Sequence, residues 1–182
     1  MERRQTPPRE RILRAALSEF AAHGPAGARI DAIARSAEAS KERLYAHFPT
    51  KHELFEAALG VSVERWLSAV PFEARDLAGW ASRLFEHLLR NPEDARMLLW
   101  GQIEGAALGG VDRAQLEWRR QEVRDAQSDG VIGSDWDIDD LLTMIFGLVL
   151  AWFVTPRTTA RPLEPDERRI GAVRSAVERL LR

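Results

Sequence analysis

Apolar residues recur with the period of an α-helix along almost the whole chain. Within residues 30–48, Ile30, Ile33 and Ala34 stand at positions i, i+3 and i+4, so a short helix there presents one narrow apolar stripe to a core. The stripe is interrupted at Glu38, and a second short helix follows within a few residues. Two short helices joined by a tight turn are the pattern of a helix-turn-helix.

The second short helix is predicted to begin at Lys41, because the Ser40 hydroxyl before it can accept a hydrogen bond from an amide of the first turn. Leu44 and Phe48 lie on one side of this helix and are expected to pack against a core. Its other sides carry a dense set of hydrogen-bonding side chains: Lys41, Glu42, Arg43, Tyr45 and His47. A helix of this kind suits a groove.

Further helices are predicted on both sides of this pair. The helix ahead of it has apolar residues at helical spacing up to Phe20 and ends at the His-Gly-Pro segment 23–25. After it, Thr50 and Glu53 have the spacing of a capping box, so a connecting helix is predicted over residues 51–70. The helix that ends at residues 23–25 and the two short helices within residues 30–48 are predicted to form one three-helix unit.

The pattern beyond Pro71 stays helical and is punctuated by Gly and Pro, with no β-alternation, hairpin turn or internal repeat. Helices are predicted over five segments: 77–90, 93–107, 111–128, 137–154 and 165 to the C-terminus. The predicted fold class is all-α, with an N-terminal three-helix helix-turn-helix domain over residues 1–50 and a C-terminal helical bundle over residues 51–182.

The run SKERLYAHFPTKHEL at residues 40–54 resembles the recognition-helix signature of the TetR family of bacterial transcriptional repressors. The preceding DAIARSA at residues 31–37 is similar to that family's second helix. Two positions depart from the pattern: Glu38 stands where the family usually has Gly, and no Ser or Thr caps the second helix around Arg29. A non-Gly residue with positive φ costs about 1 kcal/mol, so some strain is expected in the turn.

The resemblance implies a DNA-binding N-terminal domain and a C-terminal domain for ligand binding and dimerisation. Charge agrees with this division, although the 182-residue chain has a formal net charge of −2. Nine basic and six acidic residues give residues 1–50 a net charge of +3, which leaves −5 for the rest. A basic face within an acidic protein is consistent with nucleic-acid binding.

Composition excludes other classes. There is no cysteine, so the chain has no disulfide framework, thiol nucleophile or thiolate metal site, which fits a reducing cytoplasm. The longest apolar run, residues 141–154, is shorter than the roughly 18 residues that a membrane span needs. We therefore expect a soluble, cytoplasmic protein with no membrane partner.

The candidate DNA contacts divide by chemistry. Phosphate contacts are expected from four side chains: Arg29, Tyr45, His47 and Lys51. Lys51 is placed at a helix N-terminus, where amides and a cation together favour a phosphate. Arg43 can bond guanine through O6 and N7, Glu42 can accept from a cytosine amino group, and Lys41 suits either role. Ser40 is expected to cap the helix more than to contact DNA, and the alternative for His47 is a merely exposed histidine.

Two helices of the second region are too apolar or too narrowly striped for ordinary surface helices. Apolar side chains surround the helix over 137–154, and the last helix has an apolar seam at 3, 4, 3 spacing. A symmetric dimer with a four-helix interface is predicted through eight residues: Leu141, Ile145, Leu148, Trp152, Ile170, Val173, Val177 and Leu180. The alternative is that both helices are simply core of a monomer.

A small-molecule site is also predicted in the second region. Met97, Trp100 and Glu104 share one predicted helix face, and Trp118 and Phe146 on neighbouring helices could complete an apolar cavity. The TetR resemblance implies an inducer in such a place. Glu104 or Gln121 could orient a cation or a polar head group. The alternative for each of these residues is core packing.

The function predicted from these patterns is a ligand-responsive transcriptional regulator. It would bind a near-palindromic double-stranded DNA operator as a homodimer, most simply as a repressor, and leave it when a small, mainly apolar effector binds. No nucleophile elbow, glycine-rich phosphate loop or metal-ligand cluster is present in the sequence, so an enzyme is disfavoured and no metal or cofactor is expected. The alternative is a helical sensor or scaffold that acts through protein contacts.

Overall fold

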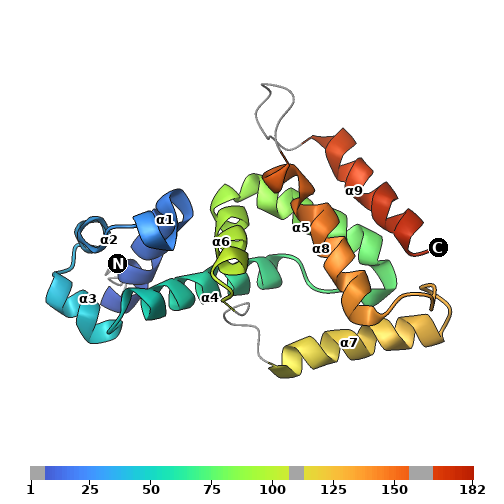
Figure 1. Cartoon of the computed structure of the whole chain (residues 1–182), viewed down its shortest axis with the longest axis horizontal. Coiled ribbons are helices and arrows are strands. Elements are labelled where there is room, and N and C mark those ends of the chain that lie inside the picture. Colours follow the sequence, from blue (N-terminus) through green and yellow to red (C-terminus); the bar gives the residue numbers. More distant parts are fainter. Residues whose placement is uncertain (1–6, 107–112, 156–165) are drawn as a thin grey trace, which may run out of the picture. The chain divides into compact units, whose positions relative to one another are not determined.

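The computed structural model describes residues 7–106, 113–155 and 166–182, and within them every regular element is helical (Figure 1). The predicted all-α fold class is confirmed. None of the described helices is both long and apolar enough to span a bilayer. The elements are α1 (Pro8–Gly27), α2 (Ile30–Ser36), α3 (Lys41–His47), α4 (Lys51–Ala69), the 3₁₀ helix η1 (Ala74–Asp76), α5 (Leu77–Arg90), α6 (Pro92–Ile103), α7 (Arg113–Ser128), α8 (Ile138–Val154) and α9 (Glu167–Leu180).

The helices form two compact units. The first comprises the described residues within 1–65 and 96–111, and the second those within 66–95 and 112–182. Helices α1 to α3 share the first unit with most of α4, because the rings of Phe20 on α1 and Phe55 on α4 meet edge to face at 5.3 Å. Packing therefore divides the chain within α4 and α6, whereas the predicted boundary after residue 50 is a division by role and stays a prediction.

The turn between α2 and α3 has the conformation that the sequence predicts. Glu38 has a φ of 51°, the only positive φ of a non-glycine residue in the described part of the chain. The amide of Ala39 bonds back to the carbonyl of Ala34 at 3.0 Å, which closes α2 with a left-handed C-terminal turn. Arg11 on α1 adds a hydrogen bond from Nε to the carbonyl of Ala37 at 3.1 Å, so the strained turn is tied to the neighbouring helix.

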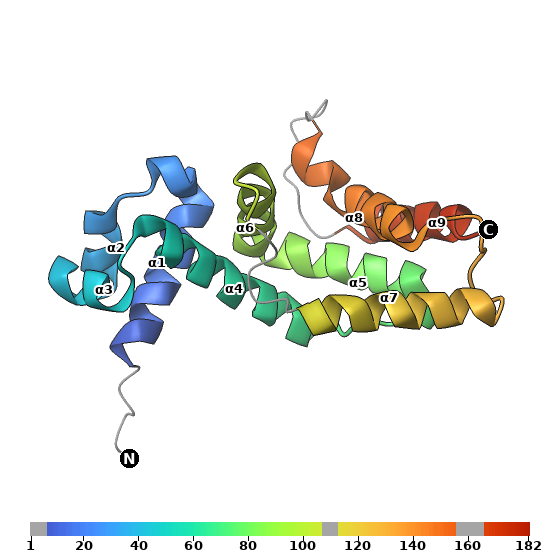
Figure 2. The ribbon, with the colours of Figure 1, turned by 60° about the horizontal axis from the view of Figure 1, so that its bottom comes forward.

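Helix α5 is the centre of the second unit, and α8 and α9 pack against it and against each other (Figure 2). The ring of Phe85 on α5 contacts both Trp152 and Phe153 of α8, at centroid distances of 5.2 and 6.0 Å. A buried polar contact joins α5 to α6, where His87 Nε2 lies 3.0 Å from a carboxylate oxygen of Asp94.

This packing buries half of the residues predicted for the dimer interface within the single chain, and the interface itself stays a prediction. Leu141, Ile145, Val173 and Val177 have no exposed surface in the single chain, so their side chains are core of the protomer and cannot add buried area in a dimer. The apolar seam of α9 is real, but the helix partners it serves are α5 and α8 of the same chain. The other four predicted positions, Leu148, Trp152, Ile170 and Leu180, are half-buried.

The predicted end of the helix over 93–107 is also wrong. Helix α6 ends at Ile103, because Gly105 has a φ of 64° and the amide of Ala106 bonds back to Gly101 at 3.0 Å. Glu104 therefore stands in an exposed turn after the helix, and not on the helix face that it was predicted to share. The predicted boundary residues 107, 111 and 165 lie outside the described residues.

Candidate nucleic-acid interface

Helix α3 exposes every side chain except Leu44, which has no accessible surface and anchors the helix to the first unit. The eight predicted DNA-contacting residues all belong to this unit, and all but the half-buried Lys51 are exposed: Arg29, Ser40, Lys41, Glu42, Arg43, Tyr45, His47 and Lys51. A short helix fixed by one buried leucine thus presents cationic, acidic and aromatic groups together to solvent.

The N-terminus of α3 is capped as predicted. Ser40 has an extended backbone, and its hydroxyl oxygen accepts a hydrogen bond from the amide of Arg43 at 3.2 Å. The backbone amide of Glu42 and the Ser40 hydroxyl hold the pKa of the Glu42 carboxyl below its usual range. Glu42 is therefore ionised at neutral pH and already engaged at the helix N-terminus, where a negative charge is favourable.

Replacing Ser40 by alanine is expected to lower the free energy of unfolding by about 1 kcal/mol, because the amide of Arg43 loses its acceptor. Urea unfolding followed by circular dichroism measures this change. Ser36→Ala is the matched control, since Ser36 is exposed at the end of α2, and an effect within about 0.5 kcal/mol is expected there. Equal losses in the two variants would contradict the capping role.

Lys41 is held by an acid of the neighbouring helix. Its ammonium group pairs with the carboxylate of Asp31 on the first turn of α2. The hydrogen bond from Lys41 holds the pKa of Asp31 below its usual range, and the same bond raises the pKa of Lys41. Both groups are therefore charged at neutral pH, and the pair is lost as the pH falls through the lowered pKa of Asp31 or rises through the raised pKa of Lys41. The pair with Asp31 therefore competes with a contact between Lys41 and a DNA phosphate.

Lys51 lies at the first position of α4, as predicted, and its Nζ donates a hydrogen bond to the carbonyl of Ala26 at 3.2 Å. Thr50 caps this helix by accepting from the amide of Glu53 at 3.1 Å. The second half of the predicted capping box differs, because the Glu53 carboxylate accepts from the Thr50 hydroxyl at 3.2 Å. The cation is thus placed beside the N-terminus of α4 and the last turn of α1.

Arg29 is the N-cap residue of α2, and no side chain of its own segment caps that helix. A residue that the sequence reading missed supplies a substitute: the carboxylate of Glu19 on α1 accepts from the Arg29 amide at 2.9 Å. This carboxylate does from another helix what the Glu of a capping box does locally. The ten-residue separation leaves no sequence signal for this contact.

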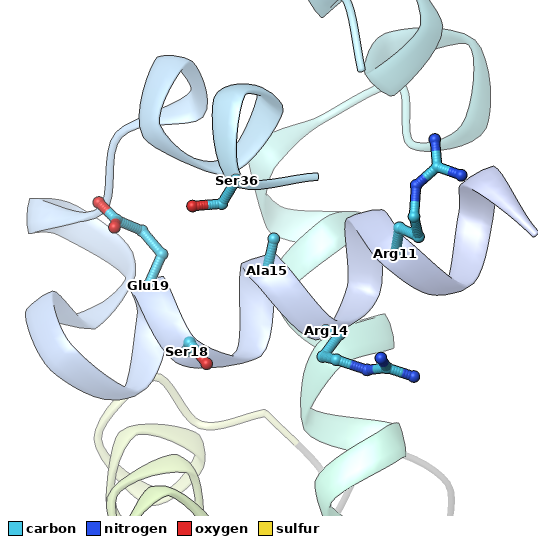
Figure 3. Close-up of a pocket in the computed structure, with 6 residues that line it drawn as sticks. All are labelled: Arg11, Arg14, Ala15, Ser18, Glu19 and Ser36. Carbon is cyan, nitrogen blue, oxygen red and sulfur yellow. The ribbon is translucent and has the colours of Figure 1, made fainter. Parts of the chain in front are cut away.

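A groove of about 380 Å³ lies between α1 and α2 (Figure 3). Five of its lining residues come from α1 and Ser36 from α2. Its charged groups already have partners: Arg11 donates to Ala37, Arg14 pairs with Glu10 at 2.9 Å, and Glu19 accepts from Arg29. The charged side chains of this groove are therefore engaged in intramolecular contacts, and none is free to bind a ligand. No group of three or more His, Asp or Glu side chains in the described residues could hold a metal ion.

Comparison with known proteins places this geometry in a family. Residues 12–58 match the family described as bacterial regulatory proteins, tetR family. Residues 76–179 match the family described as tetracyclin repressor-like, C-terminal domain. The chain belongs to the TetR family. The resemblance carried by residues 31–54 is therefore confirmed, and the chain is a transcriptional regulator with a DNA-binding helix-turn-helix.

Three known proteins match between 81% and 98% of the chain. The HTH-type transcriptional repressor SCO4008 of Streptomyces coelicolor is 37% identical over 155 residues, which are 81% of this chain and 79% of that protein. The protein SCO4942 from Streptomyces coelicolor, known from a crystal structure, is 34% identical, with a TM-score of 0.81 over 96% of this chain and 98% of that one. Salmonella enterica GusR, at 23% identity and a TM-score of 0.68, covers 98% of this chain and 97% of its own, and shares the fold.

The six residues predicted to bind the effector of this TetR-family protein are divided between the two units. Met97 is fully buried, Trp100 packs against Gly24, and Glu104 is exposed, all in the first unit. In the second unit, Trp118 is 51% exposed, and Gln121 donates to Asp125 at 2.7 Å. Phe146 lies between the rings of Trp66 and Trp80. The predicted effector role of these residues stays a prediction.

The second unit of this TetR-family protein has a groove of about 350 Å³ between the end of α4 and helix α7. Trp118 is the one predicted effector residue among those that line it. Phe72 and Arg119, which the sequence reading passed over, lie in the same groove. Helix α7 carries several arginines, and the sequence around Arg119 gives no local signal that this arginine is half-buried.

Proposed function

We propose that this chain is a cytoplasmic transcriptional repressor that binds a near-palindromic operator as a homodimer and leaves it when a small molecule binds the second unit. The observation that carries the proposal is helix α3, which is capped by Ser40, anchored by Leu44 and otherwise exposed. The repressor function of the Streptomyces coelicolor relative, named as such, supports the sign of regulation.

The exposed groups of α3 suit distinct roles at the operator. Only the backbone amide of Arg43 takes part in the Ser40 cap. Its exposed guanidinium can bond guanine through two hydrogen bonds. Tyr45, which is 44% exposed, and His47 are suited to phosphates on either side of the groove. Lys51 sits at the N-terminus of α4, where phosphate binding is favoured. Glu42 reads a cytosine only if it leaves its capping contacts.

A homodimer would use the faces of α8 and α9 that the protomer leaves open. Met144 is 50% and Val154 60% exposed on α8. Gly147 lies on the same face, and a Cβ added there would meet no atom of the described residues within 4 Å. Gly171 on α9 is similarly open. Small and apolar residues at these positions allow two helix pairs to approach closely, as a four-helix interface requires.

Helix α4 is the proposed connection between effector and DNA. It begins with Lys51 at the DNA-binding unit, and its last turns supply Leu67 and Ser68 to the groove of the second unit. An effector can shift the protein out of its DNA-binding state only by its different affinity for the two states. If the end of α4 moves between these two states, a ligand that contacts it binds the two states with different affinity.

Replacing Asp31 by asparagine is expected to tighten DNA binding about 2- to 10-fold at low salt, because it frees Lys41 and removes a negative charge near the DNA-binding helix. The salt dependence should steepen by about one unit per subunit as Lys41 gains a phosphate. Fluorescence anisotropy with a labelled operator measures both. Asp135→Asn makes the same charge change at an exposed site of the second unit, and an equal gain there would contradict a specific role for Lys41.

Selection from random-sequence DNA with the purified protein tests the proposed function. The expected product is a near-palindrome with half-sites about one helical turn or a small multiple apart, bound by two chains or a multiple of two. Complex mass by light scattering gives the stoichiometry. Selection of no sequence, with a protein that is folded by circular dichroism, would contradict the proposal and favour a sensor or scaffold that acts through protein contacts.

A further inference from the structure

The second unit contains buried hydrogen-bond donors that have no acceptor. Among the described residues, three buried side-chain polar atoms have no hydrogen-bond partner: Trp66 Nε1, Trp80 Nε1 and Arg119 Nε. All three are donors, and all three belong to the second unit. An unsatisfied buried donor costs about 1 to 3 kcal/mol, so each such group in a folded protein requires an explanation.

The three donors share one aromatic cluster. The Arg119 guanidinium lies over the rings of Phe72 and Trp66, with its carbon 5.3 and 5.9 Å from their centroids. The Phe72 ring meets Trp80 at 5.1 Å and Trp118 at 6.0 Å. Burial lowers the pKa of Arg119, yet a guanidinium keeps its proton under all ordinary conditions. A half-buried positive charge therefore rests on aromatic faces with no carboxylate paired to it in the described structure.

The same arginine lines the groove between α4 and α7. Leu67, Pro71, Phe72 and Trp118 give this groove an apolar lining, and its volume of about 350 Å³ suits a small organic molecule. No acidic side chain is among the described residues that line it. The groove thus combines apolar walls with one cation, whereas Glu104 lies exposed in the other unit and Gln121 is bonded to Asp125.

We infer that the groove binds a small organic anion, with a flat apolar body against Phe72 and Trp118 and a carboxylate that accepts hydrogen bonds from Arg119. The inference rests on the proposed function, because it names the effector class of the same regulator. A carboxylate is the acceptor that matches the planar guanidinium fork, and its bonds to a charged donor are about twice as strong as neutral ones. The sequence alone suggests a ligand with a cationic or polar group, oriented by Glu104 or Gln121. The inferred ligand carries a negative charge instead.

The position of the groove connects this ligand to α4. Leu67 and Ser68 are the contributions of α4 to the lining, and Trp66 precedes them on the same helix. A carboxylate drawn to Arg119 would move the guanidinium relative to the Trp66 ring, which is one of its two aromatic supports. The anion therefore acts on the final turn of the helix that begins at Lys51.

The opposite ligand charge is the sharpest rival. The contact of Arg119 with two rings shows that this cluster holds a cation, and a cationic ligand could occupy the rings if it displaced the arginine. Displacement would leave a second positive charge beside the first, and the described residues of the groove lining include no acid to balance them. Electrostatics therefore favours the anion.

Isothermal titration of the full chain with two probes of equal shape and opposite charge tests the inference. The probes are 2-naphthoate and 2-naphthylmethylammonium. We expect 2-naphthoate to bind at least 10-fold more tightly. Arg119→Met should weaken 2-naphthoate binding by about 10- to 100-fold, because one charge-assisted contact is lost. Arg119→Lys keeps the positive charge but not the planar guanidinium, so its affinity for 2-naphthoate should lie between those of the wild type and Arg119→Met.

Arg120→Met is the matched control. Arg120 is the next residue on α7 and pairs with Asp139 outside the groove, so 2-naphthoate affinity should change by less than about 3-fold. Equal losses in the two methionine variants, tighter binding of the ammonium probe, or no binding of 2-naphthoate up to about 1 mM would each overturn the inference. Circular dichroism establishes that each variant is folded, and Arg119→Lys carries the test if Arg119→Met is not.

Two further readings separate this inference from the proposed function. The titrations contain no DNA, so a failure of operator binding leaves their result intact. With a bound operator, 2-naphthoate should release the wild-type protein and Arg120→Met but not Arg119→Met. Operator binding that persists while 2-naphthoate fails to bind in solution would overturn the effector class alone.

Discussion

Gly24→Ala is expected to lower the free energy of unfolding by about 3 kcal/mol or more, because the substitution is strained twice. Gly24 has φ 68° and ψ 171°, a backbone region that is essentially restricted to glycine. A Cβ built there would also lie 2.6 Å from Cζ2 of Trp100, within a rigid indole ring. Neither the backbone of α1 nor the ring can relax without disturbing the packing of the first unit.

Gly27→Ala is the control for this prediction, and urea unfolding of both variants measures the difference. Gly27 ends the same helix, and the nearest atom to an added Cβ is His23 Cβ at 3.5 Å, an ordinary contact. Its expected effect is within about 1 kcal/mol. Similar stabilities of the two variants would show that the close approach of Trp100 to α1 is not part of the folded protein.

Arg43→Ala is expected to abolish the base preference at one position of each half-site, at a cost of about 1 to 3 kcal/mol, which is roughly 5- to 150-fold in affinity for the preferred base. Arg43 is exposed on α3 and its amide, not its side chain, serves the Ser40 cap. Removal of the guanidinium should therefore leave the helix in place. Sequence selection with wild type and variant, compared position by position, measures the change.

Lys51→Ala provides the contrast for Arg43→Ala. Lys51 is expected to contact a phosphate, so its removal should weaken binding to all sequences alike and reduce the salt dependence by about one unit per subunit. The two variants then differ in kind as well as in size. Identical base preferences of wild type and Arg43→Ala would show that another residue reads the operator.

Local signals predicted the fold well. The cap at Ser40, the positive φ at Glu38 and the bounds of α5 depend on residues within one or two turns of each other, and the structure has all three. The helix-turn-helix could therefore be located from its sequence alone. The error at the end of α6 had a local cause too, because Gly105 was available to end the helix before the later glycine pair.

Long-range pairings were not accessible in this way. An apolar seam such as that of α9 looks the same whether its partner is α5 of the same chain or a second subunit, and the buried Val173 and Val177 decide for the former. The pair between Lys41 and Asp31 and the cap from Glu19 join residues ten apart through tertiary packing. Arg119 is distinguished from its neighbour Arg120 only by the rings that fold over it.

The central claim is that this TetR-family chain binds DNA through the exposed groups of α3 and Lys51. Footprinting and binding at two salt concentrations, on DNA upstream of its own and neighbouring genes, test it most directly. We expect protection of a near-palindrome and a slope of log affinity against log salt of about −7, if four phosphate contacts form in each of two subunits. Binding that is independent of salt, or protection of a site without two-fold symmetry, would contradict it.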